Sequence, residues 1–243
     1  MKKWSTLFWN ALRKLRRELS KEERNENAEN RSMSFKSFGI EKTSFEIIDK
    51  EVGIHGYEPN YEWNIVRRVI HATADFDFAN KERLLFHNDA IKFGFQAIEK
   101  KCNIITDVEM VRSGISKNSL TKLNLKCICN ISNINVVDDA KRFNKTRAET
   151  AMRNLAEEMN GGIIVIGNAP TALYEVIKMI NEKITNPLLV IGVPVGFVAA
   201  VESKIELSKT TIPNITNIGR KGGSSVACSI INALMLLYLH SLE

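Results

Sequence analysis

Four histidines are the side chains of this sequence best suited to transferring a proton near neutral pH: His55, His71, His87 and His240. Histidine has an unperturbed pKa of about 6.5, so it titrates where the other common side chains do not. His71 differs from the rest because it follows an apolar run and precedes a threonine, two aspartates and two phenylalanines in RRVIHATADFDF, residues 67–78. His71 is therefore the candidate catalytic residue, with structural and metal-binding interpretations still open.

The other three histidines are expected to have minor roles. His55 lies in the turn-rich segment GIHGYEPNYEW, so we expect it to be exposed. His87 stands before Asn88 and is expected at the start of a helix, where it caps the helix or faces water, and His240 lies in the C-terminal tail. Elimination leaves His71, although a lone histidine in such a setting is more often structural than reactive.

No metal site is predicted. Asp75, Asp77 and Asp107 can orient the histidine or bind a cation, but three scattered acids are more often solvated or structural. Cys127 and Cys129 in LKCICNI point to the same face of a strand. Neither a second cysteine pair nor a nearby histidine completes a zinc site there.

Three glycine-containing loops, each after a predicted strand, form the second candidate site. They are Gly167–Thr171 (GNAPT), Gly192–Gly196 (GVPVG) and Gly219–Ser224 (GRKGGS). In an open α/β sheet the carboxyl ends of the strands share one edge, and ligands bind there. Glycine lets the backbone approach a ligand, and free N–H groups at helix starts suit anions. With Arg220 and Lys221 at the same edge, the loops predict a substrate that carries carboxylates or phosphates.

The motifs that would indicate nucleotide binding are absent from the sequence. Neither G-x-x-x-x-G-K-[ST] nor G-x-G-x-x-G occurs, and GRKGGS matches a phosphate loop in composition but not in spacing. The net charge of +6 does not indicate a nucleic-acid partner either, because residues 1–31 carry nine lysines and arginines against five glutamates. No nucleic-acid motif appears.

The strongly charged first part of the chain is predicted to be separate from the rest. Apolar side chains recur there at helical spacing, which indicates a basic amphipathic helix followed by a polar linker. We expect an extension over residues 1–34 and a single domain over residues 35–243. Contact of residues 1–20 with a membrane surface is one interpretation. Docking to a partner is another. The favoured interpretation is an appendage that packs on its own domain, or a partly disordered tail.

The rest of the composition is typical of a reduced, cytoplasmic protein. Two apolar runs, Pro187–Val201 and Ala227–Leu239, are shorter than the roughly 20 residues that a bilayer crossing needs. They are predicted to be a buried strand and a buried helix. The four cysteines occur without a secretory signal, which argues against disulfides.

Short runs rich in β-branched residues alternate with helical segments from about Phe35 onward. This alternation predicts an α/β fold whose parallel sheet is covered by helices on both faces. The predicted helix NDAIKFGFQAIEKK has Asn88 or Asp89 available as a cap, and TRAETAMRNLAEEMNGG is expected to stop at Gly161–Gly162. The predicted strands are NIITDVEMV, LKCICNI, IIVIGNAP, PLLVIGVPVGF and ITNIGRKGGS.

Seven segments, in this order along the chain, resemble the precorrin-8X methylmutase family, which includes the cobalt-precorrin-8 enzymes of cobalamin synthesis. They are IEKTSFEII, VRRVIHAT, ITDVEMVRSGI, KTR, IGNAPTAL, VIGVPVGFVAAVESK and GRKGGSSVA. The resemblance covers the chain from about residue 35 onward. It implies a three-layer α/β/α, flavodoxin-like fold with a mostly parallel sheet, and a homodimer that binds a corrin precursor near the subunit interface.

The resemblance also implies the reaction and the residues. A methyl group moves from C-11 to C-12 of precorrin-8X or cobalt-precorrin-8, giving hydrogenobyrinate or cobyrinate, with no redox or nucleotide cofactor. His71 matches the family's histidine, which protonates the ring-C nitrogen, and a non-catalytic tetrapyrrole carrier is the alternative. The candidate substrate contacts are Ser44, Thr146, Arg147, Asn168, Thr171, Pro194, Gly196, Lys204, Arg220, Lys221, Gly222 and Gly223.

The chain departs from the family pattern at a few positions. Ala74 stands where the family often has glycine, Thr43 where an arginine often precedes the serine, and Ala148 where a serine follows the arginine. These changes concern substrate contacts more than the chemistry. Lys204 also has a purely structural interpretation, as the partner of Glu202 in an ion pair.

Overall fold

A computed structural model describes residues 39–57 and 60–242 of the chain. The chain divides into two compact units, Met1–Glu51 and Val52–Glu243. A helix runs over residues 39–52, and the second unit holds all the strands and the remaining described helices. The expected domain boundary at residue 34 and the amphipathic segment of residues 1–20 lie outside the described residues.

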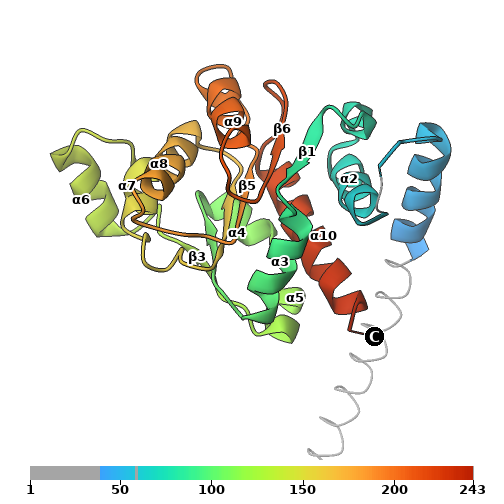
Figure 1. Ribbon diagram of the computed structural model, residues 1–243, viewed down its shortest axis with the longest axis horizontal. Helices are drawn as coiled ribbons and strands as arrows, with labels where there is room; N and C mark the ends of the chain where they lie inside the picture. Colours follow the sequence, from blue (N-terminus) through green and yellow to red (C-terminus); the bar gives the residue numbers. More distant parts are fainter. Residues whose placement is uncertain (1–38, 58–59, 243) are drawn as a thin grey trace, which may run out of the picture. The chain divides into compact units, whose positions relative to one another are not determined.

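The second unit is built on a six-stranded sheet in the order β1-β6-β5-β4-β2-β3 (Figure 1). β1 pairs antiparallel with β6, and every other neighbouring pair is parallel. The strands are β1 (Leu84–His87), β2 (Ile104–Thr106), β3 (Cys127–Cys129), β4 (Ile163–Ile166), β5 (Leu189–Gly192) and β6 (Asn214–Asn217). Without β1, the strand order is the 2-1-3-4-5 order of flavodoxin-like folds, with its switch point between β2 and β4.

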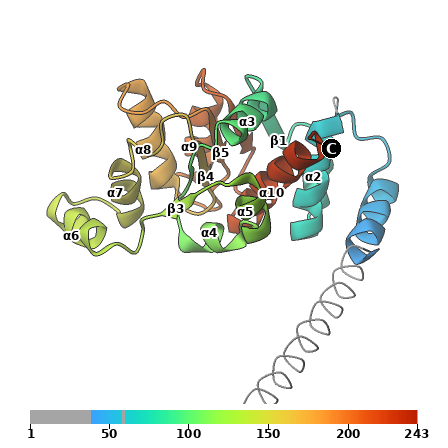
Figure 2. The ribbon, with the colours of Figure 1, turned by 90° about the horizontal axis from the view of Figure 1, so that it is seen from below.

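Helices cover both faces of this sheet, as the alternation of strands and helices predicts (Figures 1 and 2). One face packs against α7, α8 and α9 in an apolar cluster, and the other lies against α3 and α10. The described helices are α2 (Asn60–Thr73), η1 (Phe76–Ala79), α3 (Ala90–Glu99), α4 (Glu109–Gly114), α5 (Lys117–Leu123), α6 (Ile134–Arg142), α7 (Arg147–Arg153), α8 (Pro170–Asn181), α9 (Ala200–Ser208) and α10 (Ser224–His240).

The central strands show why unbroken apolar runs are needed here. All four residues of β4 are buried, and side chains of a strand alternate between its faces. Ile164 and Ile166 pack into the cluster with α7 and α8, which leaves Ile163 and Val165 for the opposite face. The run Ala227–Leu239 lies within α10, a largely buried helix. Among the described residues, no helix is both long and apolar enough to span a membrane.

Three expected elements differ from the structure. β2 has three residues, because the chain turns at Asp107 and Val108 into α4. α7 ends at Arg153 instead of Gly161, and i→i+3 turns that follow it bring Leu155 and Met159 into the core. Asp89 occupies the N-cap position of α3 without a side-chain hydrogen bond. The sequence analysis missed β1, which contains His87 as its last residue.

Candidate active site

The second and third glycine loops are joined at the carboxyl edge of the sheet. Gly223 N–H donates to the Val193 carbonyl oxygen at 2.8 Å, and Gly196 N–H donates to the Arg220 carbonyl oxygen at 3.2 Å. A Cβ at Gly222 would collide with that Val193 oxygen, and Gly222 has φ +137°. Glycine is therefore required at residue 222 by both space and backbone conformation. Pro194, between the two contacts, is buried.

The first loop is closed from inside by Asp107, which follows β2. Its carboxylate accepts hydrogen bonds from the backbone N–H groups of Gly167 (3.1 Å), Asn168 (2.8 Å) and Ala169 (2.7 Å). Burial raises the pKa of Asp107, and the three N–H donors act in the opposite direction. The expectation that the N–H groups of this loop are free for a substrate anion is wrong, because the protein's own carboxylate occupies them.

The segment that carries Thr146 and Arg147 fastens the same loop from outside. The Thr146 and Thr171 hydroxyl oxygens lie 2.9 Å apart in a hydrogen bond. Thr146 also caps α7, because its hydroxyl accepts from Glu149 N–H at 3.1 Å. Arg147 and Asn168 are both exposed. The structure thus brings together four of the predicted contacts that are far apart in the sequence.

Lys204 fastens the third loop from inside. It is 2% exposed, and its Nζ donates to the Lys221 carbonyl oxygen at 2.7 Å and to Asn217 Oδ1 at 3.3 Å. Asn217 Nδ2 donates to the same carbonyl oxygen at 2.7 Å. Burial lowers the pKa of Lys204 to about 8. These inward contacts give Lys204 a structural role that does not involve Glu202.

Lys221 fastens this loop from outside, to the segment that follows His71. Its Nζ lies 2.8 Å from Asp75 Oδ2 and 2.6 Å from Asp77 Oδ2. Asp75 also caps η1 by accepting from Asp77 N–H at 3.1 Å. The two aspartates that the sequence offers as partners of His71 therefore connect its segment to the third loop.

His71 lies in the last turn of α2 and is exposed. The helix ends at Thr73, and Ala74 N–H donates back to the Ile70 carbonyl oxygen at 2.7 Å. Ala74 has φ +53°, a left-handed conformation that glycine adopts without strain. The backbone thus gives a physical reason for a glycine preference at residue 74, and it places Asp75 directly after the turn.

The model of the precorrin-8X methylmutase family matches residues 39–237. The chain belongs to that family. It is 47% identical over 206 residues to the cobalt-precorrin-8 methylmutase of Leptospira interrogans, covering 82% of this chain and 92% of the relative. The corresponding enzyme of Priestia megaterium is 48% identical over 198 residues, covering 82% of this chain and 87% of the relative.

A solved precorrin-8X methylmutase from Thermus thermophilus has the same fold. Its TM-score is 0.76 at 35% identity, covering 83% of this chain and 98% of that structure. The α/β fold with a mostly parallel sheet is therefore confirmed. Methylmutases are isomerases. Because the chain belongs to the precorrin-8X methylmutase family, the three loops and the segment around His71 form the candidate active site of an isomerase.

The other histidines of this methylmutase family member are placed differently from expectation. His55 is half-buried, stacks on Trp63 at 4.1 Å between ring centroids, and accepts from Tyr57 N–H at 3.1 Å. His87 ends β1 and so does not begin a helix. Among the described residues, its buried Nε2 has no hydrogen-bond partner. His240 is exposed at the end of α10. The expectation that His55 is exposed is wrong, and the choice of His71 over the other three histidines stays a prediction.

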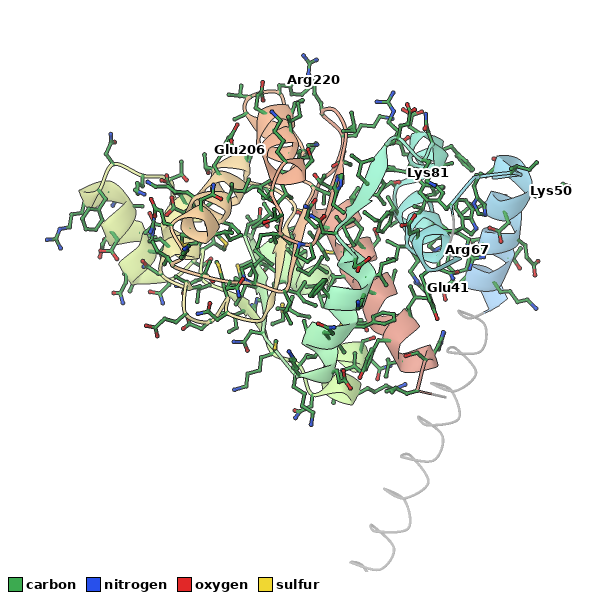
Figure 3. All side chains as sticks on the ribbon, in the orientation of Figure 1. Glu41, Lys50, Arg67, Lys81, Glu206 and Arg220 are labelled. Carbon is green, nitrogen blue, oxygen red and sulfur yellow. The ribbon has the colours of Figure 1, made fainter. Side chains whose placement is uncertain are left out.

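The remaining predicted contacts are of two kinds. Arg220 is exposed, and its guanidinium lies 5.3 Å from the centroid of the Phe197 ring; Figure 3 shows its side chain pointing outward from the loop. Ser44 lies in the helix of residues 39–52, in the other unit, and its hydroxyl donates to the Ile40 carbonyl oxygen at 2.8 Å. Across the described ranges, no group of three or more histidine, cysteine or acidic side chains can hold a metal ion.

Sequence reasoning missed Asn217 and Arg83. Asn217 is the last residue of β6 and is 1% exposed. β6 reads Asn-Ile-Thr-Asn, and the signal that could have identified Asn217 is its polar side chain at the carboxyl end of a strand. Arg83 lies in KER, a charged run without any motif.

Proposed function

We propose that this protein moves a methyl group from C-11 to C-12 of precorrin-8X or cobalt-precorrin-8, giving hydrogenobyrinate or cobyrinate, with His71 as general acid. The observation that carries the proposal is the position of His71: it is exposed, and Asp75 and Asp77, four and six residues further along the chain, are bound to Lys221 of the third loop. A positioned imidazole beside a cationic loop suits the protonation of an acidic macrocycle.

The proposed reaction needs only proton movement by the protein. The His71 imidazolium donates its proton to the ring-C nitrogen, which draws electron density out of the macrocycle. The methyl group then leaves C-11 and bonds to C-12, and the proton on nitrogen returns to the His71 imidazole when the conjugated product forms. Atoms are rearranged and no electrons are gained or lost. A positioned general acid typically contributes about 10²- to 10⁴-fold to the rate.

The decisive experiment compares His71→Ala with His240→Ala, a change at another exposed histidine. Purified protein is mixed with the precorrin substrate, and the appearance of the orange-pink hydrogenobyrinate chromophore is followed. We expect His71→Ala to lose about 10²-fold or more in turnover while still binding the product, and His240→Ala to retain turnover. Undiminished turnover by His71→Ala would show that His71 is not the proton donor.

A carrier that holds a tetrapyrrole without converting it is the second candidate function. The exposed cationic loop is compatible with binding alone. Wild-type protein that binds hydrogenobyrinate or cobyrinate but converts neither precorrin-8X nor cobalt-precorrin-8 would establish this alternative.

We further propose a cobalt-bearing substrate, a homodimer and a cytoplasmic location. The two relatives described above are both named cobalt-precorrin-8 methylmutases, which supports the cobalt-bearing form. Turnover measured in parallel on the cobalt-bearing and cobalt-free substrates tests that choice. Sedimentation of the full chain and of a chain lacking residues 1–31 tests the dimer, and vesicle binding by the same pair tests the membrane interpretation.

A further inference from the structure

A cavity of about 250 Å³ opens beside the third loop of the candidate active site. It lies between η1, the residue before β1 and the end of β6. Pockets that hold whole ligands are commonly about 300–1,000 Å³, so this space suits one arm of a larger molecule. Its lining residues are Asp77, Phe78, Arg83, Asn217, Ile218, Gly219, Arg220 and Lys221.

The cations at this edge differ in what they already bind. Lys204 is buried and donates to a backbone oxygen of the loop. The ammonium of Lys221 lies between the carboxylates of Asp75 and Asp77. In the described part of the chain, neither Arg83 nor Arg220 has a carboxylate within ion-pair distance. Among the residues that line this cavity, the two guanidinium groups are therefore the cations left to meet an anion from outside.

Arg83 is held at the wall of the cavity by the sheet. Its carbonyl oxygen accepts from Ile218 N–H at 3.0 Å, next to the pairing of Leu84 with Asn217. Its Nη1 lies only 4.0 Å from where a Cβ would stand on Gly219, so the guanidinium extends along the loop. Lys221, and more weakly Arg83, lower the pKa of Asp77, which keeps that carboxylate ionised and bound to Lys221.

We propose that this cavity is a carboxylate-binding subsite, in which Arg83 and Arg220 bind one acidic side chain of the substrate. The proposal rests on the proposed function for the identity of the substrate. Guanidinium groups present paired N–H donors that match the two oxygens of a carboxylate. Lys221 also lines the cavity, but its ammonium is already paired with Asp75 and Asp77, so Arg83 supplies the second cation beside Arg220.

The test compares Arg83→Gln with Lys81→Gln. Lys81 is exposed two residues earlier and does not line the cavity, so its loss removes the same charge from the same region. Loss of a charged hydrogen-bond donor should raise both the KM for the precorrin substrate and the Kd for hydrogenobyrinate about tenfold or more. The kcat should stay within twofold of wild type, and Arg83→Lys should recover part of the affinity.

The possible outcomes distinguish a failure of the proposed subsite from a failure of the proposed reaction. If wild type turns over the substrate and the two glutamine variants have equal KM and Kd values, the subsite is wrong and the reaction stands. If wild type turns over neither the cobalt-bearing nor the cobalt-free substrate, the proposed reaction is wrong, and the Kd for hydrogenobyrinate still decides whether the subsite exists. A fall in kcat at unchanged Kd would also overturn it, because the residue would then act on the chemical step instead of on binding.

Discussion

The first and third loops at the edge of the sheet are held in matching ways by groups of opposite charge. A buried carboxylate, Asp107, holds the first loop by accepting from its backbone N–H groups. A buried ammonium, Lys204, holds the third loop by donating to a backbone carbonyl oxygen. Each loop also has an outer fastening: the hydroxyl pair of Thr146 and Thr171 for the first, and the ion pairs of Lys221 for the third.

The difference in charge determines what each loop can offer a ligand. Because Asp107 occupies the N–H groups at the switch point, the first loop has no vacant anion site there. The third loop has its carbonyl oxygen bound and its N-terminal side facing the cavity that contains Arg83 and Arg220. The proposed carboxylate subsite thus lies away from the crevice where flavodoxin-like folds usually bind their ligands.

The largest effect is expected for Asp107→Ala, which removes the buried carboxylate that holds the first loop. Three N–H groups lose their acceptor, so the free energy of unfolding should fall by about 3 kcal/mol or more, and turnover should fall with it. Added formate should restore part of the stability, because a small carboxylate can occupy the vacated position. Urea unfolding with formate or with chloride measures this.

Asp138→Ala, at an exposed aspartate of α6, is the matched control for that change. A loss no larger than in the control, with no formate effect, would show that Asp107 does not hold the loop. If Asp107→Ala does not fold, Asp107→Asn keeps one acceptor oxygen and allows the same comparison with a smaller loss.

The next largest effect concerns Lys204, the buried lysine that holds the third loop, and it depends on pH. Burial lowers the pKa of Lys204 to about 8, whereas an unfolded lysine titrates at about 10.4. Between these values the unfolded chain binds the proton and the folded chain releases it, so the Lys204 contribution to the free energy of unfolding rises with pH. Relative to Lys204→Met, wild type should gain up to about 3 kcal/mol across this interval.

Chemical unfolding of wild type and Lys204→Met at a series of pH values measures this gain. Lys122→Met, at an exposed lysine of α5, should show no such divergence. A constant difference between wild type and Lys204→Met at every pH would contradict the lowered pKa.

A smaller effect distinguishes the hydrogen bond between Thr146 and Thr171 from the ion pairs of Lys221 by their response to salt. Thr171→Val removes a neutral hydrogen bond and should cost about 1 kcal/mol of unfolding free energy at any ionic strength. Lys221→Gln removes exposed ion pairs, so its stability difference from wild type should be small and should vanish as salt is added. Thermal unfolding of both variants at low and high salt makes the comparison. Equal salt responses of the two variants would show that the Lys221 contacts are no more electrostatic in character than the hydrogen bond of Thr171.

The smallest effect concerns the turn that delivers Asp75 and Asp77 to Lys221. Ala74→Gly should raise the free energy of unfolding by about 0.5 kcal/mol, because the relief of left-handed strain slightly exceeds the added entropy of the unfolded glycine. Ala72→Gly, two residues earlier within α2, should instead lower it by about 1 kcal/mol. Urea unfolding of both variants shows whether the signs are opposite, and equal signs would contradict the strain.

The sequence predicts the layers of this fold well because that signal is local. An unbroken run such as Ile163–Ile166 indicates a strand buried on both faces, and the glycine loops mark where strands end. β1 has four residues between a charged run and a turn, which is too short for a periodic signal. The antiparallel edge strand was therefore missed, and His87 was placed at a helix start.

The candidate site is less predictable because its fastenings join distant parts of the chain. Asp107 binds a loop 60 residues later, and Lys221 binds Asp75 across 146 residues. No spacing in the sequence indicates such pairs, so Lys221 was expected to be a substrate cation, and Lys204 was expected to contact either the substrate or Glu202. In the sequence, Ala74 stands out only as a departure from the family pattern. Its left-handed backbone conformation explains why glycine is often found at this residue.

The sheet also bears on how the protein behaves at high concentration. Its two outermost strands are β3, with three residues, and β1, with four. An exposed strand edge can recruit a strand from a neighbouring chain, and short edges offer few hydrogen bonds for such growth. Because β1 and β3 are short, they limit edge-to-edge aggregation. Substitutions that lengthen either strand should therefore be avoided when the protein is engineered for storage.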